Sequence, residues 1–153
     1  MNAPLSTDPS HGPWDTEPQR ARWLDTSVRF WCLIVRHPTL KHLCGYIGIP
    51  LGHPWFGKGY DDIRMADNDW PEVHGGLTYA SDHEPGEGRG SKSELWWIGF
   101  DCSHCGDLCP GMLRYGSRAD RDETYKDWDY VKSECESLAR QARQTAKSVE
   151  NVP

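Results

Sequence analysis

Apolar and polar residues follow the period of β-strands through the middle of the chain. Residues 28–35 and 43–49 are rich in β-branched and aromatic side chains and flank a turn around Pro38, which predicts a β-hairpin. Segments 72–80 and 94–101 have the same character and predict a second antiparallel pair. Both faces of 94–101 carry apolar side chains, so we expect this strand to be central. The pattern predicts a small, mainly antiparallel sheet of about four strands.

Near the C-terminus the apolar period changes from two to between three and four. This spacing predicts one long amphipathic helix. The residues that share its apolar stripe are Tyr125, Trp128, Val131, Cys135, Leu138 and Ala142. A helix with a single stripe must bury that stripe against another element. We therefore expect a loop-rich α+β domain in which the helix packs across the sheet.

Three regions follow from the distribution of apolar residues. Residues 1–20 hold several prolines and few apolar residues, which predicts a flexible N-terminal arm, with Trp14 as the one anchor that could dock it. Residues 21–148 form one compact domain, and 149–153 a frayed C-terminus. Inside the domain, 50–71 predicts a long loop rich in Gly, Pro and aromatic residues. Loops of this length in a compact domain usually carry function.

Composition narrows the class of protein. A chain of 153 residues is long enough for one domain, and eight Trp and six Tyr predict an aromatic core. The net charge of −6 comes from well-mixed acidic and basic residues, which disfavours general nucleic-acid binding. The longest apolar run is far shorter than the roughly 20 residues of a membrane span, and no signal peptide is visible. We therefore expect a cytoplasmic protein that does not enter a membrane, and its six Cys as free thiols or metal ligands.

The strongest candidate for chemistry follows directly after the predicted central strand. Asp101, His104 and Asp107 are spaced by three, so a helical turn would gather them on one side. There they could hold one Mg²⁺ or Mn²⁺, or act as a general acid and base. His74, expected on the neighbouring strand, could supply a fourth group. The alternative is structural: carboxylates that cap turns and a histidine that binds a backbone carbonyl.

Two further sets of residues are candidate sites, and each allows more than one interpretation. Cys102, Cys105 and Cys109 have a spacing similar to a zinc knuckle, which would need a fourth ligand to complete a zinc site. Within the long loop, glycines alternate with aromatic residues and one lysine. A loop of this composition could bind an anion or stack on a nucleotide base. Alternatively, its aromatic side chains only pin the loop onto the sheet. The candidate binding residues of this loop are His53, Trp55, Lys58 and Tyr60, with His74 beyond them.

Five motifs carry a resemblance to a known family. They are Leu43-Cys44-Gly45-Tyr46-Ile47-Gly48, Gly52-His53-Pro54, Val73-His74-Gly75-Gly76-Leu77-Thr78-Tyr79, Trp96-Trp97-Ile98-Gly99-Phe100-Asp101-Cys102 and Tyr130-Val131-Lys132. Through them, residues 23–140 resemble an uncharacterised family of small proteins encoded by bacteriophages, prophages and related mobile elements. The residues that match its pattern beyond these motifs are His104, Gly106 and Asp107. Cys105 and Cys109 depart from it, which weakens the zinc hypothesis.

The resemblance implies a setting rather than a mechanism. Small accessory proteins of phages often block host defences, so we expect a binding protein of the host cytoplasm, with an anti-defence role such as an anti-CRISPR role. Its partner would be a host protein or a small nucleotide ligand, bound by one face built from 50–71 and 101–113. The alternative is a metal-dependent hydrolase of a phosphate ester or nucleotide. In that case Asp101 and Asp107 would be ligands, His104 a ligand or base, and His74 would orient the substrate.

Overall fold

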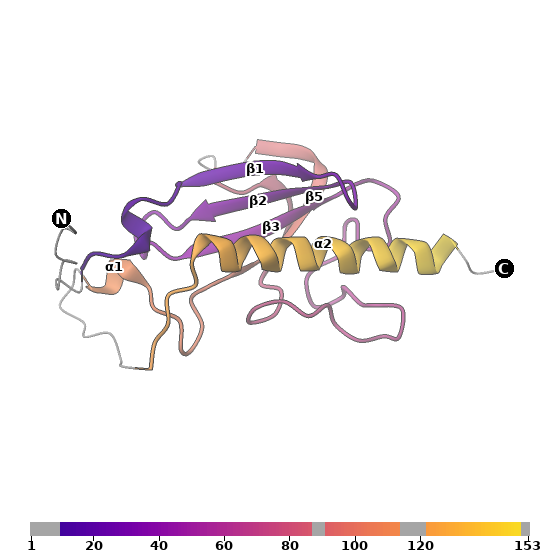
Figure 1. Ribbon diagram of the computed structural model, residues 1–153. Coiled ribbons are helices and arrows are strands. Elements are labelled where there is room, and N and C mark those ends of the chain that lie inside the picture. Colours follow the sequence, from indigo (N-terminus) through magenta and orange to yellow (C-terminus); the bar gives the residue numbers. More distant parts are fainter. Residues whose placement is uncertain (1–9, 87–90, 114–121, 151–153) are drawn as a thin grey trace.

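A long helix lies across one face of an antiparallel sheet of five strands (Figure 1). The computed structural model describes residues 10–86, 91–113 and 122–150. The elements are β1 (Arg20–Asp25), β2 (Phe30–Arg36), β3 (Leu43–Ile49), β4 (Tyr79–Glu84), β5 (Ser91–Asp101), the short α1 (Pro110–Leu113) and α2 (Trp128–Glu150). The strand order is β1-β2-β3-β5-β4. The predicted α+β fold is confirmed.

The sheet agrees with the sequence pattern at its centre and differs at its edges. The hairpin of β2 and β3 forms as predicted, and β5 lies between β3 and β4. The strand expected at 72–80 begins only at Tyr79, because Gly75 and Gly76 adopt positive φ values of 67° and 80° that a strand does not contain. The edge strand β1 was not predicted. Half of its residues are polar, and none of its side chains is fully buried.

The core lies between the sheet and α2. Gly45 of β3 allows the helix to pack closely on the sheet, since a Cβ atom there would lie 2.5 Å from the Phe100 ring and 2.7 Å from the Cys135 sulfur of α2. The helix contributes five buried residues to this core, namely Val131, Cys135, Leu138, Ala139 and Ala142. On the opposite face Trp97 is fully buried, and the Arg22 guanidinium stacks on Trp31 at 4.2 Å. All six cysteines are free thiols.

Residues 10–19, which we expected to belong to a flexible arm, lie against the domain. The Trp14 ring packs edge-on against Tyr125, with ring centroids 4.9 Å apart. The Glu17 carboxylate accepts hydrogen bonds from the buried Arg36 guanidinium at 3.1 Å and from the backbone N–H of Trp128 at 2.7 Å. Trp128 is the first residue of α2, so Glu17 satisfies a helix donor that would otherwise lack a partner. The rest of the predicted arm, residues 1–9, lies outside the described residues.

Replacing Glu17 with Gln is expected to lower the free energy of unfolding by about 2 kcal/mol, because the buried Arg36 charge loses its partner. Urea denaturation measures the effect. Glu123→Gln, at an exposed acidic position before α2, serves as control and should change stability by no more than about 0.5 kcal/mol. Equal stability of the two variants would contradict the anchoring role of Glu17.

The strand register places the starts of two segments, which we expected to share one face, at opposite ends of the sheet. In the antiparallel pair of β3 and β5, Cys44 lies opposite Asp101 and Ile49 lies opposite Trp96. The segment after β3 and the segment after β5 therefore leave the sheet at opposite ends. That 50–71 and 101–113 build a single binding face stays a prediction. Within the described residues, no helix combines the length and the apolar character needed to cross a membrane.

Candidate functional site

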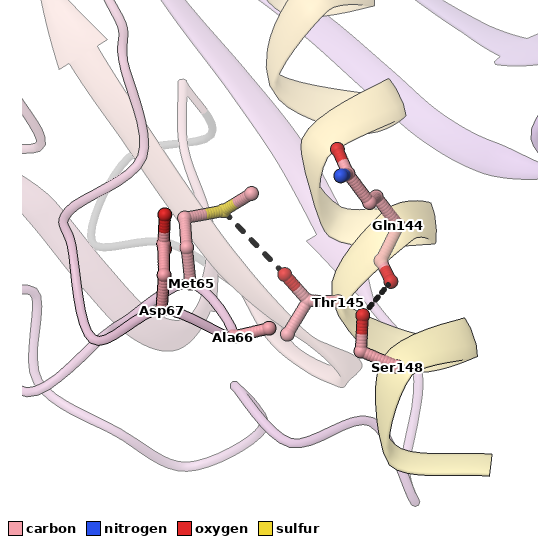
Figure 2. Close-up of a pocket in the computed structure, with 6 residues that line it drawn as sticks. All are labelled: Met65, Ala66, Asp67, Gln144, Thr145 and Ser148. Atoms are coloured by element: carbon pink, nitrogen blue, oxygen red, sulfur yellow. Dashed lines mark hydrogen bonds between the residues drawn. The ribbon is translucent and has the colours of Figure 1, made fainter. Parts of the chain in front are cut away.

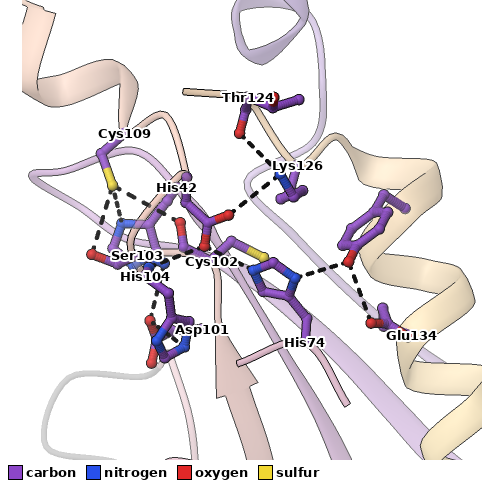
Figure 3. Close-up of polar contacts among 12 residues, drawn as sticks. His42, His74, Asp101, Cys102, Ser103, His104, Cys109, Thr124, Lys126 and Glu134 are labelled. Carbon is purple, nitrogen blue, oxygen red and sulfur yellow. Dashed lines mark hydrogen bonds and ion pairs between the residues drawn. The ribbon is translucent and has the colours of Figure 1, made fainter. Parts of the chain in front are cut away.

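The polar residues singled out in the sequence gather where β5 ends, between a turn, the 72–78 loop and the start of α2 (Figure 3). The turn is closed by the Asp107 N–H, which donates to the His104 carbonyl at 2.9 Å. Gly106 within it has a φ of 89°, a conformation that favours glycine. The expected helical turn does not form, because residues 105 and 106 make a turn instead.

Asp107 is the centre of the cluster. Its carboxylate accepts hydrogen bonds from His74 Nε2 at 2.8 Å and from the backbone N–H of His104 at 3.0 Å. Lys126 Nζ lies 3.4 Å from the other carboxylate oxygen. Burial alone would raise the pKa of Asp107, but the hydrogen bonds from His74 and His104, together with Lys126, hold it below its usual value. The side chain is buried and ionised.

The His74 ring bridges Asp107 and α2. Its Nε2 atom lies 2.8 Å from the Asp107 carboxylate, and its Nδ1 atom lies 2.8 Å from the Tyr130 hydroxyl. Glu134 Oε1 lies 3.4 Å from the same hydroxyl. Burial and the neighbouring Glu134 raise the pKa of Tyr130, so the phenol keeps its proton at neutral pH. His74 lies on a turn rather than on the expected strand, and both of its ring nitrogens have partners within the chain.

Asp101 and His104 form a separate pair beside this centre. The Asp101 carboxylate accepts hydrogen bonds from the Thr78 hydroxyl at 2.8 Å and from the Ser103 N–H at 3.0 Å. His104 Nε2 lies 3.5 Å from Asp101 Oδ1 and has no hydrogen-bond partner among the described residues. Gly75 packs directly on the His104 ring, where a Cβ atom would lie 2.2 Å away. Glycine at this position therefore allows the ring to sit against the loop.

Neither predicted metal site is assembled. Asp101 and Asp107 bind different partners, and the described part of the chain contains no group of three or more His, Cys, Asp or Glu arranged to hold a metal ion. In the alternative zinc set, Cys102 is buried, Cys105 is exposed and Cys109 contacts Ser103 and a histidine instead. Burial raises the pKa of the Cys102 and Cys109 thiols, which disfavours the thiolates that zinc requires.

Two of the binding residues predicted in the long loop belong to the core. Trp55 is 1% exposed, and its indole N–H donates to the Arg64 carbonyl at 2.7 Å. His53 is buried as well: Nε2 donates to the Ala142 carbonyl at 2.7 Å and Nδ1 accepts from the Trp55 N–H at 3.0 Å. Burial of the two side chains and the bond from His53 to Ala142 anchor the loop, but they tie it to α2 rather than to the sheet alone, as the structural alternative had it. Lys58 and Tyr60 are exposed.

The charges of the cluster limit its chemistry. A histidine held by a buried carboxylate is oriented as a general base would be. However, the cluster holds the carboxylates of Asp101, Asp107 and Glu134, and among its described residues Lys126, which pairs with Asp107, is the one ammonium. Such a balance repels a phosphate ester. The arrangement is better suited to joining the 72–78 loop and the 104–107 turn to α2.

Several residues of functional interest were not singled out in the sequence. Lys126 and Glu134 complete the polar cluster together with Tyr130, which the sequence marked only as part of the Tyr130-Val131-Lys132 motif and not as a site residue. Trp70 is one of the aromatic residues of the 50–71 loop, and its side chain is 61% exposed. No family model matches the sequence, and no curated protein or solved structure matches the chain.

Proposed function

We propose that the chain acts by binding another protein through Trp70 and the surface around it. One observation carries the proposal: of the eight tryptophans, Trp70 alone is exposed, while the other seven are buried or half-buried. Aliphatic residues are scarce here, and the fold uses the remaining indoles in or around its core. Tryptophan is among the residues most enriched at the energetic centres of protein interfaces. An exposed indole is therefore best explained by a partner that covers it.

The partner that we propose is a host protein in the bacterial cytoplasm, with inhibition of a defence system as the result. The motifs at 43–48, 73–79 and 96–102, which resemble those of phage and mobile-element proteins, support this setting. A protein partner is favoured over a nucleotide because a hollow beside Trp70 is lined by Asp67, Asp69 and Glu72. These carboxylates would repel phosphate groups and attract a cationic surface.

Trp70→Ala is expected to weaken binding of the host partner at least tenfold while changing the free energy of unfolding by no more than about 1 kcal/mol. Leu51→Ala provides a matched control, because Leu51 is also a large exposed apolar residue of the same loop and does not line the hollow. The measurement compares the host proteins retained by the wild type and by each variant, together with protection of phage plating in a host that carries the defence system.

A protein that is retained by the wild type and by Leu51→Ala, but not by Trp70→Ala, supports the proposal. Full protection by Trp70→Ala would contradict it. A second contradicting result comes from the hydrolase alternative. Turnover of bis(4-nitrophenyl) phosphate with added Mg²⁺, Mn²⁺ or Zn²⁺, lost in His104→Ala at an unchanged melting temperature, would assign the polar cluster to catalysis instead.

A further inference from the structure

Three adjoining hollows make a groove along one side of α2. The first lies between Met65, Ala66 and Asp67 on the loop and Gln144, Thr145 and Ser148 on the helix (Figure 2). The second shares Met65, Asp67 and Gln144 with the first and adds Trp70. The third shares Glu72 and Ser137 with the second and ends at His74 and Glu134. We call the surface formed by these three hollows the α2 groove.

Hydrogen bonds between the loop and the helix hold the two sides of the α2 groove. The Gln141 amide accepts from the Glu72 N–H at 2.8 Å and donates to the Glu72 carbonyl at 2.7 Å. The Thr145 hydroxyl lies 3.5 Å from the Met65 sulfur, as Figure 2 shows. Since these contacts join backbone and side chains from both walls, the groove is formed before any partner binds. A preformed site lowers the entropic cost of binding.

The charged residues of the α2 groove are of one sign. Asp67, Asp69, Glu72 and Glu134 line it, and among the described lining residues there is no Lys or Arg. The helix side otherwise offers hydroxyl and amide groups from Ser137, Gln141, Gln144, Thr145 and Ser148. Trp70 adds an exposed indole whose ring already stacks on the Arg64 guanidinium at 3.8 Å. Carboxylates, hydrogen-bonding groups and an aromatic ring together suit cationic side chains.

The dimensions of the α2 groove indicate an extended occupant. From Glu134 to Ser148 the helix rises about 21 Å, which an extended chain covers with about six residues. The three hollows have volumes of about 300, 350 and 280 Å³. Each is at or near the lower limit of about 300 Å³ for pockets that enclose a small molecule. A row of small, connected hollows fits successive side chains better than one compact ligand.

We propose that the α2 groove binds an extended basic segment of the partner protein, with Lys or Arg side chains placed against Asp67, Asp69 and Trp70. This inference rests on the proposed function, since it names the part of the partner that covers Trp70. The side chains of the segment would enter the hollows in turn. Charge complementarity with the carboxylates sets the preference for basic residues, and the indole adds contact area.

The test titrates a fluorescently labelled peptide of alternating Lys and Ala residues into the full chain at about 0.15 M salt, where the screening length is about 8 Å. Asp67→Asn/Asp69→Asn is expected to weaken binding at least tenfold. Asp61→Asn/Asp62→Asn changes the net charge equally, and both residues are exposed on the same loop without lining the α2 groove. This control should weaken binding less than twofold. A peptide of alternating Glu and Ala should not bind.

Equal losses in the two double variants would overturn the inference, because binding would then depend on net charge alone. Absence of binding by the wild type would overturn it as well. Host-partner retention separates this failure from a failure of the proposed function. If Trp70→Ala loses the partner while Asp67→Asn/Asp69→Asn keeps it, the α2 groove inference fails and the proposed function stands. If both variants keep the partner, both proposals fail.

Discussion

Replacing Asp107 with Asn is expected to lower the free energy of unfolding by about 3 kcal/mol, because the change breaks a buried and charged hydrogen-bond centre. The carboxylate accepts from His74 and from the His104 backbone and pairs with Lys126. An amide of the same shape offers one acceptor oxygen and turns two N–H donors toward groups that are themselves donors. Buried donors are then left without partners, and Lys126 loses its counter-charge.

Urea denaturation followed by tryptophan fluorescence measures this effect. Asp62→Asn, at an exposed carboxylate of the long loop, removes the same charge and should change stability by no more than about 0.5 kcal/mol. The 72–78 loop should also exchange its amide hydrogens faster in Asp107→Asn, because His74 is no longer held. Wild-type stability in Asp107→Asn would show that the cluster does not join the loop, the turn and α2.

Acidification from pH 7 to pH 4 is expected to remove about 3 kcal/mol of stability through His42. Burial lowers the pKa of His42 from 6.5 to about 4, and the neighbouring His37 ring, stacked at 4.9 Å, acts in the same direction. The nearby Asp101 and Asp107 oppose the shift without cancelling it. The Cys109 thiol, 3.7 Å from His42 Nδ1, completes its surroundings.

The loss of stability on acidification follows from proton binding by His42 in the folded and the unfolded chain. Above pH 6.5 His42 is neutral whether the chain is folded or unfolded, so stability does not depend on its titration. Between pH 6.5 and 4 the unfolded chain binds a proton that the folded protein does not, so stability falls as the pH falls. Burial also lowers the pKa of His53, which adds to the same loss. Asp107, with a pKa below its usual 3.8, contributes a loss only at still lower pH.

Urea denaturation at pH 7, 5.5 and 4.5 tests this dependence. The free energy of unfolding should decrease at each step, and the slope should be smaller in His42→Gln, in which the titrating group is absent. His11→Gln serves as control, because the His11 ring is largely exposed. Equal wild-type stability at pH 7 and pH 4.5 would contradict the burial of a neutral His42.

The sequence pattern was sufficient for the elements that bury their side chains strongly. We predicted the hairpin of β2 and β3, the central β5 and the apolar stripe of α2. In these elements the period of the apolar residues follows directly from which side chains are buried. The strand β1 was not predicted, because an edge strand needs few apolar residues. The strand predicted at 72–80 begins too early, because the β-branched and aromatic residues of this segment favour a strand. The positive φ values of Gly75 and Gly76 are incompatible with one.

For the candidate site, the sequence identified the residue types but not their arrangement. His74, His104 and Asp107 do meet, yet the spacing of three suggested a helical turn where Gly106 makes a tight turn instead. Burial of a single aromatic residue in a loop has no sequence signature, so the sequence predicts Trp55 as a binding residue although it is buried. For the same reason Trp70 was not singled out: only the packing of the loop against α2 shows which indole stays exposed.

The most direct test of the central claim maps the binding surface in solution. An NMR titration of the ¹⁵N-labelled chain with the peptide of alternating Lys and Ala residues reports which backbone amides change their environment. We expect the largest shifts at residues 65–74, at the Trp70 indole N–H and along the α2 positions near Gln141 and Gln144. Shifts confined to the end of β5 around His104, or no shifts at saturating peptide, would contradict a partner site along α2.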